Sequence, residues 1–249
     1  MVDLVFKDIA GGRFYNADCF DAMKEIPDGC VDMILCDLPY GTTECKWDSI
    51  IPFGPLWKEY ERVIKDNGAI VLTAAMPFTA TLVCSNLRLF RYSLVWDKVN
   101  KYTGSLNANR MPLRRHEDIL VFYKKLPVYN KQFRTGKAFV STNNNGHGEH
   151  TNYGKGAEFR TTVQDGLHHN PCSVIEIKAD NKKELGLHPT QKPIELFEYL
   201  IKTYTDEGHL VLDNCAGSGT TAVACKNLNR RWVCVEKDTG YYEKALERL

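Results

Sequence analysis

A glycine loop between an apolar strand and a helix, near the end of the printed sequence, constrains the fold more than any other feature. Leu210 to Asp213 is an apolar run with strand character, Gly217-Ser218-Gly219 follows it, and Thr220 to Asn227 has a helical pattern. The next expected strand, Arg231 to Glu236, ends in a carboxylate. Glycines let a backbone pass close to a ligand, and a carboxylate at the tip of the second strand can accept both ribose hydroxyls. The segment therefore predicts a nucleoside site.

The same loop leaves two alternatives open. With Ala222 as its third small residue it also satisfies the dinucleotide fingerprint, which is typical of NAD-dependent oxidoreductases. A tight strand-to-helix turn without a ligand is the other alternative, and the spacing to Glu236 argues against it. A dinucleotide domain beginning at Leu210 would need further strands, yet only one helix, Tyr241 to Leu249, is expected after Glu236. The remaining strands must precede the loop, which is a circularly permuted order.

Strand-like and helix-like patterns alternate through the rest of the sequence, and Asp66-Asn67-Gly68 is a turn signal before one of the strands. Besides the segments already named, strands are expected at 12–18, 31–36, 69–73, 91–96 and 209–213, and helices at 20–26, 56–64, 79–87 and 193–204. Alternation of this kind predicts an α/β fold, a Rossmann-like, doubly wound and mostly parallel sheet with helices on both faces.

Residues 124–183 interrupt this pattern. The helical period disappears there, and Ser141 to Gly156 is rich in Asn, Gly, His and Ser. A chain of 249 residues with 43% hydrophobic content has room for one core and one small insertion. We therefore expect a catalytic domain formed by 1–123 and 184–249, with 124–183 as an inserted, loop-rich lobe.

Composition narrows the setting. The nine cysteines have no repeated spacing, which favours free thiols in a reducing compartment over a disulfide framework. There is no leader-like start, and the longest apolar runs, such as Gly68 to Ala75, are too short to cross a bilayer, so we expect a soluble, cytoplasmic protein. A net charge of +1 means that any contact with nucleic acid must come from a local cluster of charge.

A second motif, Asp37-Leu38-Pro39-Tyr40, follows the expected buried strand Val31 to Cys36, at the edge where open parallel sheets bind ligands. The amine of a nucleobase is a poor nucleophile because its lone pair is delocalised into the ring. Asp37 can accept one amine N–H and the Leu38 carbonyl the other, while Tyr40 stacks on the base and Pro39 fixes the turn. A lone tetrapeptide of this kind is more often a helix cap in a proline turn. Two independent motifs at the ends of different strands favour a catalytic site.

The two motifs together resemble those of the DNA amino-methyltransferases that use S-adenosylmethionine, in the permuted (beta-type) N6-adenine/N4-cytosine group where the catalytic tetrapeptide precedes the cofactor loop. Asn16-Ala17-Asp18-Cys19, His188 to Pro193, Trp96-Asp97-Lys98 and Arg114 to Phe122 also resemble family segments. The resemblance implies the class I methyltransferase fold and methyl transfer to N6 of an adenine flipped out of the duplex. It implies cofactor contacts from Asp18, Cys19, His188, Thr190, Lys192, Asp213, Asn214, Cys215, Gly217, Gly219, Thr220, Thr221 and Glu236.

Some of these implied roles are specific. Asp18 is expected at the adenine of the cofactor, and Thr190 and Lys192 at its methionine end, where an ammonium can face a carboxylate. The sequence departs from the family at Cys215, where Phe is usual, and at Leu38, where Pro is usual. Leucine keeps the backbone acceptor, so we expect activity to survive. Asp at position 37 is similar to the adenine enzymes, since the cytosine-N4 enzymes more often carry Ser.

Flipping a base requires strong contacts to the DNA backbone, and basic residues gather after the expected catalytic strands and into the lobe. The residues expected to contact double-stranded DNA are Lys98, Arg110, Arg114, Arg115, Lys131, Arg134 and Asn144. No metal site is expected, because the spacing of His147, His150, His168, His169 and Cys172 fits no standard zinc site. The resemblance also allows a homodimer.

Four other functions stay open on the sequence alone. Cytosine N4 in DNA or adenine in RNA would keep the mechanism and change the acceptor. A non-catalytic homologue would bind nucleic acid and transfer nothing, although the intact Asp37, Tyr40, Gly217 and Gly219 argue against it. The NAD-dependent oxidoreductase depends on the glycine pattern alone.

Overall fold

The computed structural model describes residues 4–9, 11–42, 48–143, 160–180 and 191–249. These residues form two compact units, one made of 1–130 and 173–249 and the other of 131–172. The separate unit is shorter than the lobe expected from the sequence, because residues on both sides of it pack in the larger unit.

The larger unit contains one sheet, with strand order β1-β2-β11-β10-β3-β4-β6-β5-β9 among the described residues. The strands are β1 (Val5–Ile9), β2 (Gly12–Asn16), β3 (Val31–Asp37), β4 (Ile64–Ala74), β5 (Phe90–Asp97), β6 (His116–Phe122), β9 (Val174–Glu176), β10 (Leu210–Asp213) and β11 (Arg231–Glu236). Pairing is antiparallel between β1 and β2 and on both sides of β6, and it is parallel elsewhere. The prediction of a mostly parallel, Rossmann-like sheet is confirmed.

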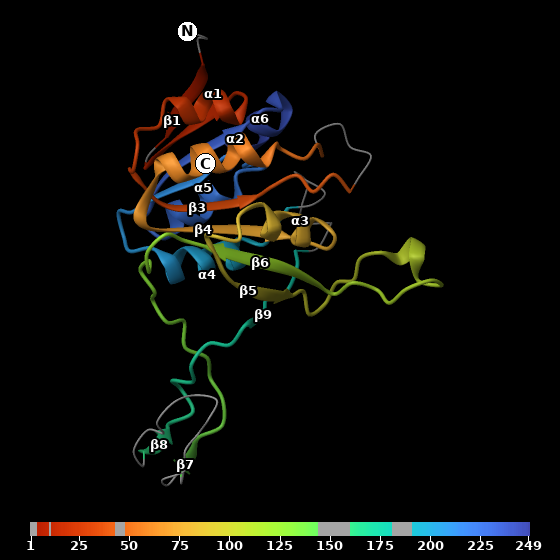
Figure 1. Ribbon diagram of the computed structural model, residues 1–249, viewed down its shortest axis with the longest axis vertical. Coiled ribbons are helices and arrows are strands. Elements are labelled where there is room, and N and C mark those ends of the chain that lie inside the picture. The colour runs from red at the N-terminus through yellow and green to blue at the C-terminus, as the bar shows by residue number, and fades with distance from the viewer. Residues whose placement is uncertain (1–3, 10, 43–47, 144–159, 181–190) are drawn as a thin grey trace. The chain divides into compact units, whose positions relative to one another are not determined.

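Helices cover both faces of this sheet (Figure 1). On one face lie α4 (Ile194–Tyr204), α5 (Thr220–Asn227) and α6 (Thr239–Leu246), which share a core with Met33, Leu35 and Val211. On the other lie α1 (Cys19–Lys24), α2 (Phe53–Val63) and α3 (Phe78–Ser85), which share a second core with Ile34, Cys36 and Leu212. Because side chains alternate along a strand, a strand buried on both faces reads as a continuous apolar run.

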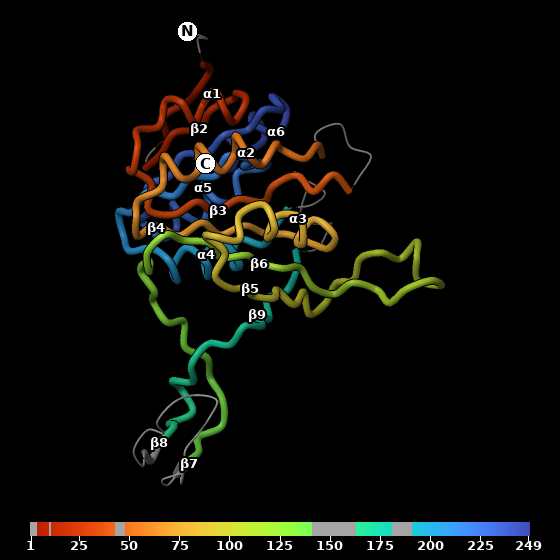
Figure 2. Tube along the Cα trace, in the orientation of Figure 1, coloured from red at the N-terminus to blue at the C-terminus, as the bar shows by residue number. Residues whose placement is uncertain are grey.

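Early and late parts of the chain lie side by side in the sheet. Strand β10 is parallel to β3, with Val211 opposite Met33 and Leu212 opposite Ile34. Figure 2 shows the blue C-terminal strands among the red and orange N-terminal ones. The tetrapeptide and the glycine loop therefore leave neighbouring strands at the same edge, as the permuted order predicts.

Three strands of the sheet were not expected from the sequence. Strand β1 is an exposed edge hairpin with β2, and β6 is antiparallel to both of its neighbours. Strand β9 lies inside the segment expected to be the lobe, yet it pairs in parallel with β5. Its three residues are too few for a periodic pattern.

The expected turn at 66–68 is also different, since these residues belong to β4. The register between β3 and β4 jumps from Val31 opposite Ile64 to Met33 opposite Ala69, so Asp66-Asn67-Gly68 marks an irregularity within a strand. A Cβ on Gly68 would lie 2.9 Å from the Asp32 carbonyl oxygen and 2.7 Å from Ile64 side-chain atoms. Glycine is needed there because the two backbones approach closely.

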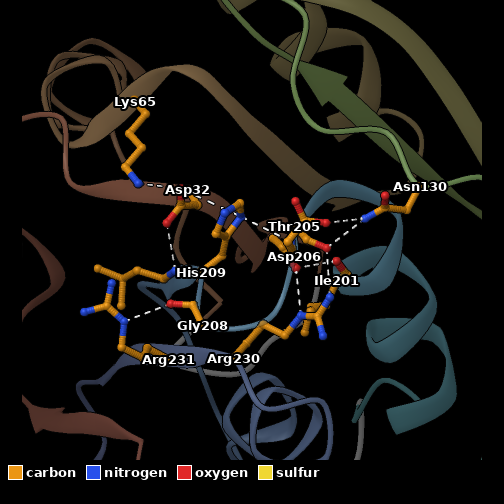
Figure 3. A network of polar contacts seen from close by, with 11 residues as sticks. Asp32, Lys65, Asn130, Ile201, Thr205, Asp206, Gly208, His209, Arg230 and Arg231 are labelled. Carbon is orange, nitrogen blue, oxygen red and sulfur yellow. Dashed lines mark hydrogen bonds and ion pairs between the residues drawn. The ribbon is translucent and has the colours of Figure 1, made fainter.

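Polar contacts connect the chain at the other end of the parallel strands, where β3 and β10 begin (Figure 3). Asp32 accepts a hydrogen bond from the Leu210 amide at 2.9 Å and from the Lys65 ammonium at 2.6 Å. The Asn130 side-chain amide donates to the Thr205 carbonyl oxygen at 3.0 Å and to the Asp206 carboxylate at 2.9 Å, just past the end of α4. The two contacts of Asn130 hold the chain at the point where it leaves the larger unit.

The smaller unit contains the antiparallel pair β7 (Phe139–Asn143) and β8 (Arg160–Gln164). An isolated bridge joins Arg134 to His169. His168 contacts the Asp165 carboxylate at 2.5 Å, and a ring nitrogen of His169 lies 2.9 Å from the Lys137 carbonyl oxygen. His147 and His150 lie outside the described residues.

Two general features complete the fold. The cysteines of the described segments, Cys45 not being among them, are free thiols. No helix within the described ranges is both long enough and apolar enough to span a membrane.

The close approach at Gly68 gives a stability prediction. We expect Gly68→Ala to lower the free energy of unfolding by about 1–3 kcal/mol, because the added methyl meets backbone that cannot move aside. Urea denaturation followed by circular dichroism measures this. The matched control is Gly54→Ala in α2, where an added Cβ meets nothing within 4 Å and alanine favours the helix. Equal effects of the two substitutions would contradict the prediction.

Candidate active site

Asp37 and Asp213 end neighbouring parallel strands on the same face of the sheet. Met33, Leu35 and Val211 belong to the core under α4 and α5, and alternation along each strand places both aspartates on that face. The Asp37 carboxylate is therefore on the side of the sheet that carries the glycine loop and α5.

Three donors hold the Asp37 carboxylate. Its Oδ1 accepts hydrogen bonds from the Tyr40 hydroxyl at 2.8 Å and from the hydroxyl of Thr73, the residue of β4 that is paired with Asp37. Its Oδ2 accepts from the Lys192 ammonium at 2.6 Å. A carboxylate offers about four lone-pair sites, so Asp37 keeps capacity for one further donor.

Lys192 is the centre of a buried group of charges. Its Nζ lies 3.2 Å from Glu117 Oε2 as well as 2.6 Å from Asp37, and Glu117 Oε1 lies 2.6 Å from the Lys98 ammonium. Burial opposes the charged form of Lys192, yet Asp37 and Glu117 together hold its pKa above the ordinary value. Burial would likewise raise the pKa of Glu117, but the two lysines hold it below the ordinary value. Lys192 and Glu117 are thus both held in their charged forms at neutral pH.

Gln191 joins this group to the glycine loop. Its side-chain oxygen accepts a hydrogen bond from the Ser218 hydroxyl at 2.9 Å, while the next residue, Lys192, binds Asp37. Two adjacent residues before α4 therefore contact both motifs, and the motifs lie in one site.

The glycine loop is fixed by the carboxylate at the end of β11. Gly217 has a φ of +51°, and its amide donates to Glu236 Oε2 at 2.8 Å, while the Asp238 amide donates to Oε1 at 2.8 Å. Burial raises the pKa of Glu236, although these two amides act in the opposite direction. A Cβ on Gly217 would meet nothing within 4 Å, so the loop faces open space. Gly219 caps α5, which begins at Thr220.

Asp213 lies beneath this loop and is 2% exposed. Its carboxylate accepts hydrogen bonds from the Thr221 hydroxyl and from the Cys215 amide at 3.1 Å. Burial raises the pKa of Asp213 to about 7, although these donors favour the charged form. The Asp213 side chain thus supports the loop from below.

Asn214 and Cys215 line the loop towards the second core. The Asn214 side-chain oxygen accepts a hydrogen bond from the buried Tyr60 hydroxyl at 2.6 Å. Cys215, Cys36 and Cys19 lie near one another, and burial raises the pKa of Cys19 to about 12. Asp18 caps α1 by accepting from the Phe20 amide at 3.0 Å, and it also contacts Lys237 at 3.1 Å. His188 and Thr190 lie outside the described residues.

Tyr40 is stacked on Phe78, with ring centroids 5.1 Å apart and planes inclined by 24°. The Leu38 side chain packs in the second core and is 3% exposed, which explains why an apolar residue serves at this position. Pro39 joins these two residues, so the turn holds Tyr40 over Asp37.

The residues expected to contact DNA differ in exposure and in the partners they bind. Lys98 is 5% exposed and paired with Glu117, so we correct its expected role, because a phosphate would have to break a buried ion pair to reach it. Arg115 binds Asp97, with its Nε 2.6 Å from Oδ1. Arg110 and Arg114 are exposed. Lys131 and Arg134 belong to the smaller unit, where both bind Asn170, and Asn144 lies outside the described residues.

Residues 98–115 form an arm that leaves the sheet between β5 and β6, at the edge where β3 and β4 also end (Figure 1). Thr103 and Arg114 pair across it, with backbone hydrogen bonds of 2.8 and 3.0 Å. The short 3-10 helix η1 (Ser105–Asn107) lies in the arm, and its Leu106 is 99% exposed. The arm carries no acidic residue.

Three contributors to the site were not assigned a role from the sequence, namely Thr73, Glu117 and Gln191. Glu117 and Gln191 stand within segments that carry the family resemblance, which was the available signal. Thr73 ends an apolar strand, and only its place beside β3 brings it to Asp37.

Comparison with known proteins shows the family to which the sequence is similar. A family model described as DNA methylase, of the N6/N4 group, matches residues 31–247. The Type II methyltransferase M.HpaI of Haemophilus parainfluenzae is 28% identical over 95% of this chain and 74% of its own length. The DNA adenine methyltransferase YhdJ of Escherichia coli is 26% identical over 94% of this chain and 81% of its own length.

Solved structures show the same fold. The M1.HpyAVI-SAM complex has a TM-score of 0.66 and 24% identity, covering 96% of this chain and all of that one. The cytosine-N4-specific PvuII DNA methyltransferase has a TM-score of 0.69 and 15% identity, covering 96% of this chain and 86% of that one.

The raised pKa of Asp213 predicts a pH dependence of stability. Between the unfolded pKa of about 4 and the folded value of about 7, the folded state keeps a proton that the unfolded state releases, so stability falls as pH rises through this window. We expect Asp213→Asn to remove that loss, which amounts to about 2–3 kcal/mol between pH 5 and pH 8. Urea denaturation of both proteins at the two pH values measures it. Parallel pH dependences would contradict the raised pKa.

Proposed function

The chain belongs to the DNA methylase family, which makes it an S-adenosylmethionine-dependent amino-methyltransferase of DNA, and we propose that its acceptor is N6 of a flipped-out adenine. The observation that carries the proposal is the Asp37 carboxylate, which three side chains hold at the sheet edge with capacity for one more donor. An exocyclic amine is a donor of the required kind.

The open space beside Gly217 fits the cofactor. Glu236 accepts the Gly217 amide on one oxygen and the Asp238 amide on the other, and each oxygen retains a lone pair that can accept a ribose hydroxyl. Asp18, Asp213, Asn214 and Cys215 surround the same loop and would complete the site. When bound there, S-adenosylmethionine supplies a methyl group on a sulfonium, which is strongly electrophilic.

The residues of the tetrapeptide act on the base. Asp37 accepts one N–H of the amine and the Leu38 carbonyl accepts the other, which directs the nitrogen lone pair out of the ring plane. Phe78 covers one face of Tyr40 and the Lys192 ammonium lies 5.6 Å from the ring centroid, so the base stacks on the part of the ring that these two leave open. As the nitrogen–carbon bond forms, the carbon–sulfur bond breaks with its electrons remaining on sulfur, and the amine proton passes through Asp37 to water. In-line positioning supplies much of the rate.

Adenine is favoured over cytosine by Asp37 and by the relatives. The DNA adenine methyltransferase YhdJ is similar along most of both chains. The cytosine-N4-specific PvuII enzyme has the same fold, and cytosine N4 is therefore the second candidate. Both acceptors use the same geometry, so only the product distinguishes them.

The DNA-binding surface is proposed from charge. Arg110 and Arg114 are exposed on the acid-free arm beside the site, where they can bind phosphates. Lys131, Arg134 and Asn144 are proposed to contact DNA from the inserted region 124–183, which we propose selects the target sequence. The homodimer stays a prediction.

The product identifies the acceptor. We expect DNA incubated with the protein and labelled S-adenosylmethionine to yield N6-methyladenine after digestion to nucleosides. Asp37→Ala should lower the transfer rate by about 100-fold or more, because it removes an acceptor that acts mainly in the transition state, while binding of S-adenosylhomocysteine persists. Labelled N4-methylcytosine would replace our proposal with the second candidate. Parallel loss of binding and transfer in Asp37→Ala would place the site elsewhere.

The arm gives a separate prediction. We expect Arg114→Gln to weaken binding to DNA of any sequence and to reduce the slope of log K against log salt by about 0.9, as the loss of one phosphate contact requires. Fluorescence anisotropy over a salt series measures the slope. The control is Arg13→Gln. Arg13 pairs with Asp8 and is on β2, which is next to the outermost strand β1 and on the other side of the sheet from β5 and β6. An unchanged slope in Arg114→Gln would exclude the contact.

A further inference from the structure

The ammonium of Lys192 lies against the catalytic carboxylate, and this position raises a question about its role. The family resemblance assigns Lys192 to the methionine carboxylate of the cofactor. In the structure, its Nζ is 2.6 Å from Asp37 and 3.2 Å from Glu117. The Lys192 side chain is only 7% exposed, so these contacts are enclosed in protein.

The charges around Lys192 form a line of alternating sign. Asp37, Lys192, Glu117 and Lys98 follow one another, and the outer lysine is buried as deeply as the inner one. A buried charge is costly unless it is paired, and here each charge has a partner and the sum is zero. A third carboxylate brought to Lys192 would have to compete with Asp37 and Glu117 for the same ammonium.

Glu117 lies between the Lys98 and Lys192 ammonium groups, where it can hold Lys192 in place. Its Oε1 is held by Lys98, and its Oε2 has no hydrogen-bond partner other than the ion-pair contact with Lys192. Glu117 is on β6 and Lys98 directly follows β5, so two neighbouring strands carry the support. Lys192, by contrast, comes from a segment without helix or strand structure just before α4. Rigid strands thus fix the ammonium that the less regular segment supplies.

We propose that Lys192 is a positioning residue for Asp37 rather than a ligand of the cofactor carboxylate, and that Glu117, held by Lys98, keeps Lys192 in place. Lys192 fixes the orientation of the Asp37 carboxylate and directs its remaining lone pair to the amine. The proposal relies on the proposed role of Asp37 as the amine acceptor, and it holds for an adenine or a cytosine amine alike.

Two ligands separate the possible roles of Lys192. S-adenosylhomocysteine carries the amino-acid carboxylate, whereas 5′-methylthioadenosine lacks the amino-acid portion, so the ratio of their dissociation constants reports contacts to that portion. We expect Lys192→Met to change this ratio by less than about threefold while the single-turnover transfer rate falls by about 100-fold. If binding of S-adenosylhomocysteine weakened by about tenfold or more relative to binding of 5′-methylthioadenosine, Lys192 would be shown to bind the cofactor carboxylate and the proposal would be overturned, as it would be by an unchanged transfer rate.

The control variant is Lys65→Met. Lys65 binds Asp32 at 2.6 Å, so it also pairs with an aspartate of β3, but at the opposite edge of the sheet (Figure 3). We expect it to leave both the transfer rate and the ligand ratio unchanged. A loss of transfer similar to that of Lys192→Met would mean that any ion pair on β3 supports activity, and the specific role of Lys192 would be excluded.

A conservative variant separates positioning from general stability. Lys192→Arg should recover part of the rate. If Lys192→Met does not fold, Glu117→Gln gives the same test, with an expected loss of about tenfold and the ligand ratio unchanged. No recovery of the rate in Lys192→Arg would overturn the proposal. Methylation of cytosine by the unaltered protein would refute only the choice of adenine.

Discussion

The ion pair between Asp37 and Lys192 is the interaction on which the site depends. It joins the end of β3 to a segment that precedes α4, 155 residues later in the chain. Because the Lys192 ammonium is withdrawn from water, it needs Asp37 and Glu117 as partners, and Glu117 in turn pairs with Lys98. The energetic requirement of pairing buried charges therefore also fixes the direction of the catalytic carboxylate. Stability and function are served here by the same contacts.

The permuted order of the sheet makes this arrangement possible. Parallel pairing of β10 with β3 brings the carboxyl ends of two strands together, one leading to the glycine loop and the other to the tetrapeptide. Side-chain alternation then places Asp213 and Asp37 on the same face, above α4 and α5. The two aspartates differ because Asp37 has an ammonium partner, whereas Asp213 has only neutral donors and burial raises its pKa to about 7.

Much of this arrangement follows from local patterns in the sequence, and the rest depends on distant contacts. The apolar runs and the glycine loop predicted most of the parallel strands. The predicted bounds of helix α5 (Thr220–Asn227) and strand β11 (Arg231–Glu236) are the observed ones. Strand β9 was not predicted because three residues are too few to show a periodic pattern. Residues 66–68 were predicted to form a turn, but Gly68 is needed there because two backbones approach closely. Lys98 looked like a surface cation, since sequence alone does not show that Glu117 lies opposite it. The position of Lys192 was also beyond local reasoning, because its partner is chosen by the tertiary fold.

The adjacency of Gln191 and Lys192 has a geometric consequence. One of them binds Ser218 in the glycine loop and the other binds Asp37, so a single peptide bond spans the two halves of the site. A shift of the glycine loop is thus passed to the base pocket through one dipeptide and the hydrogen bonds that its two side chains make.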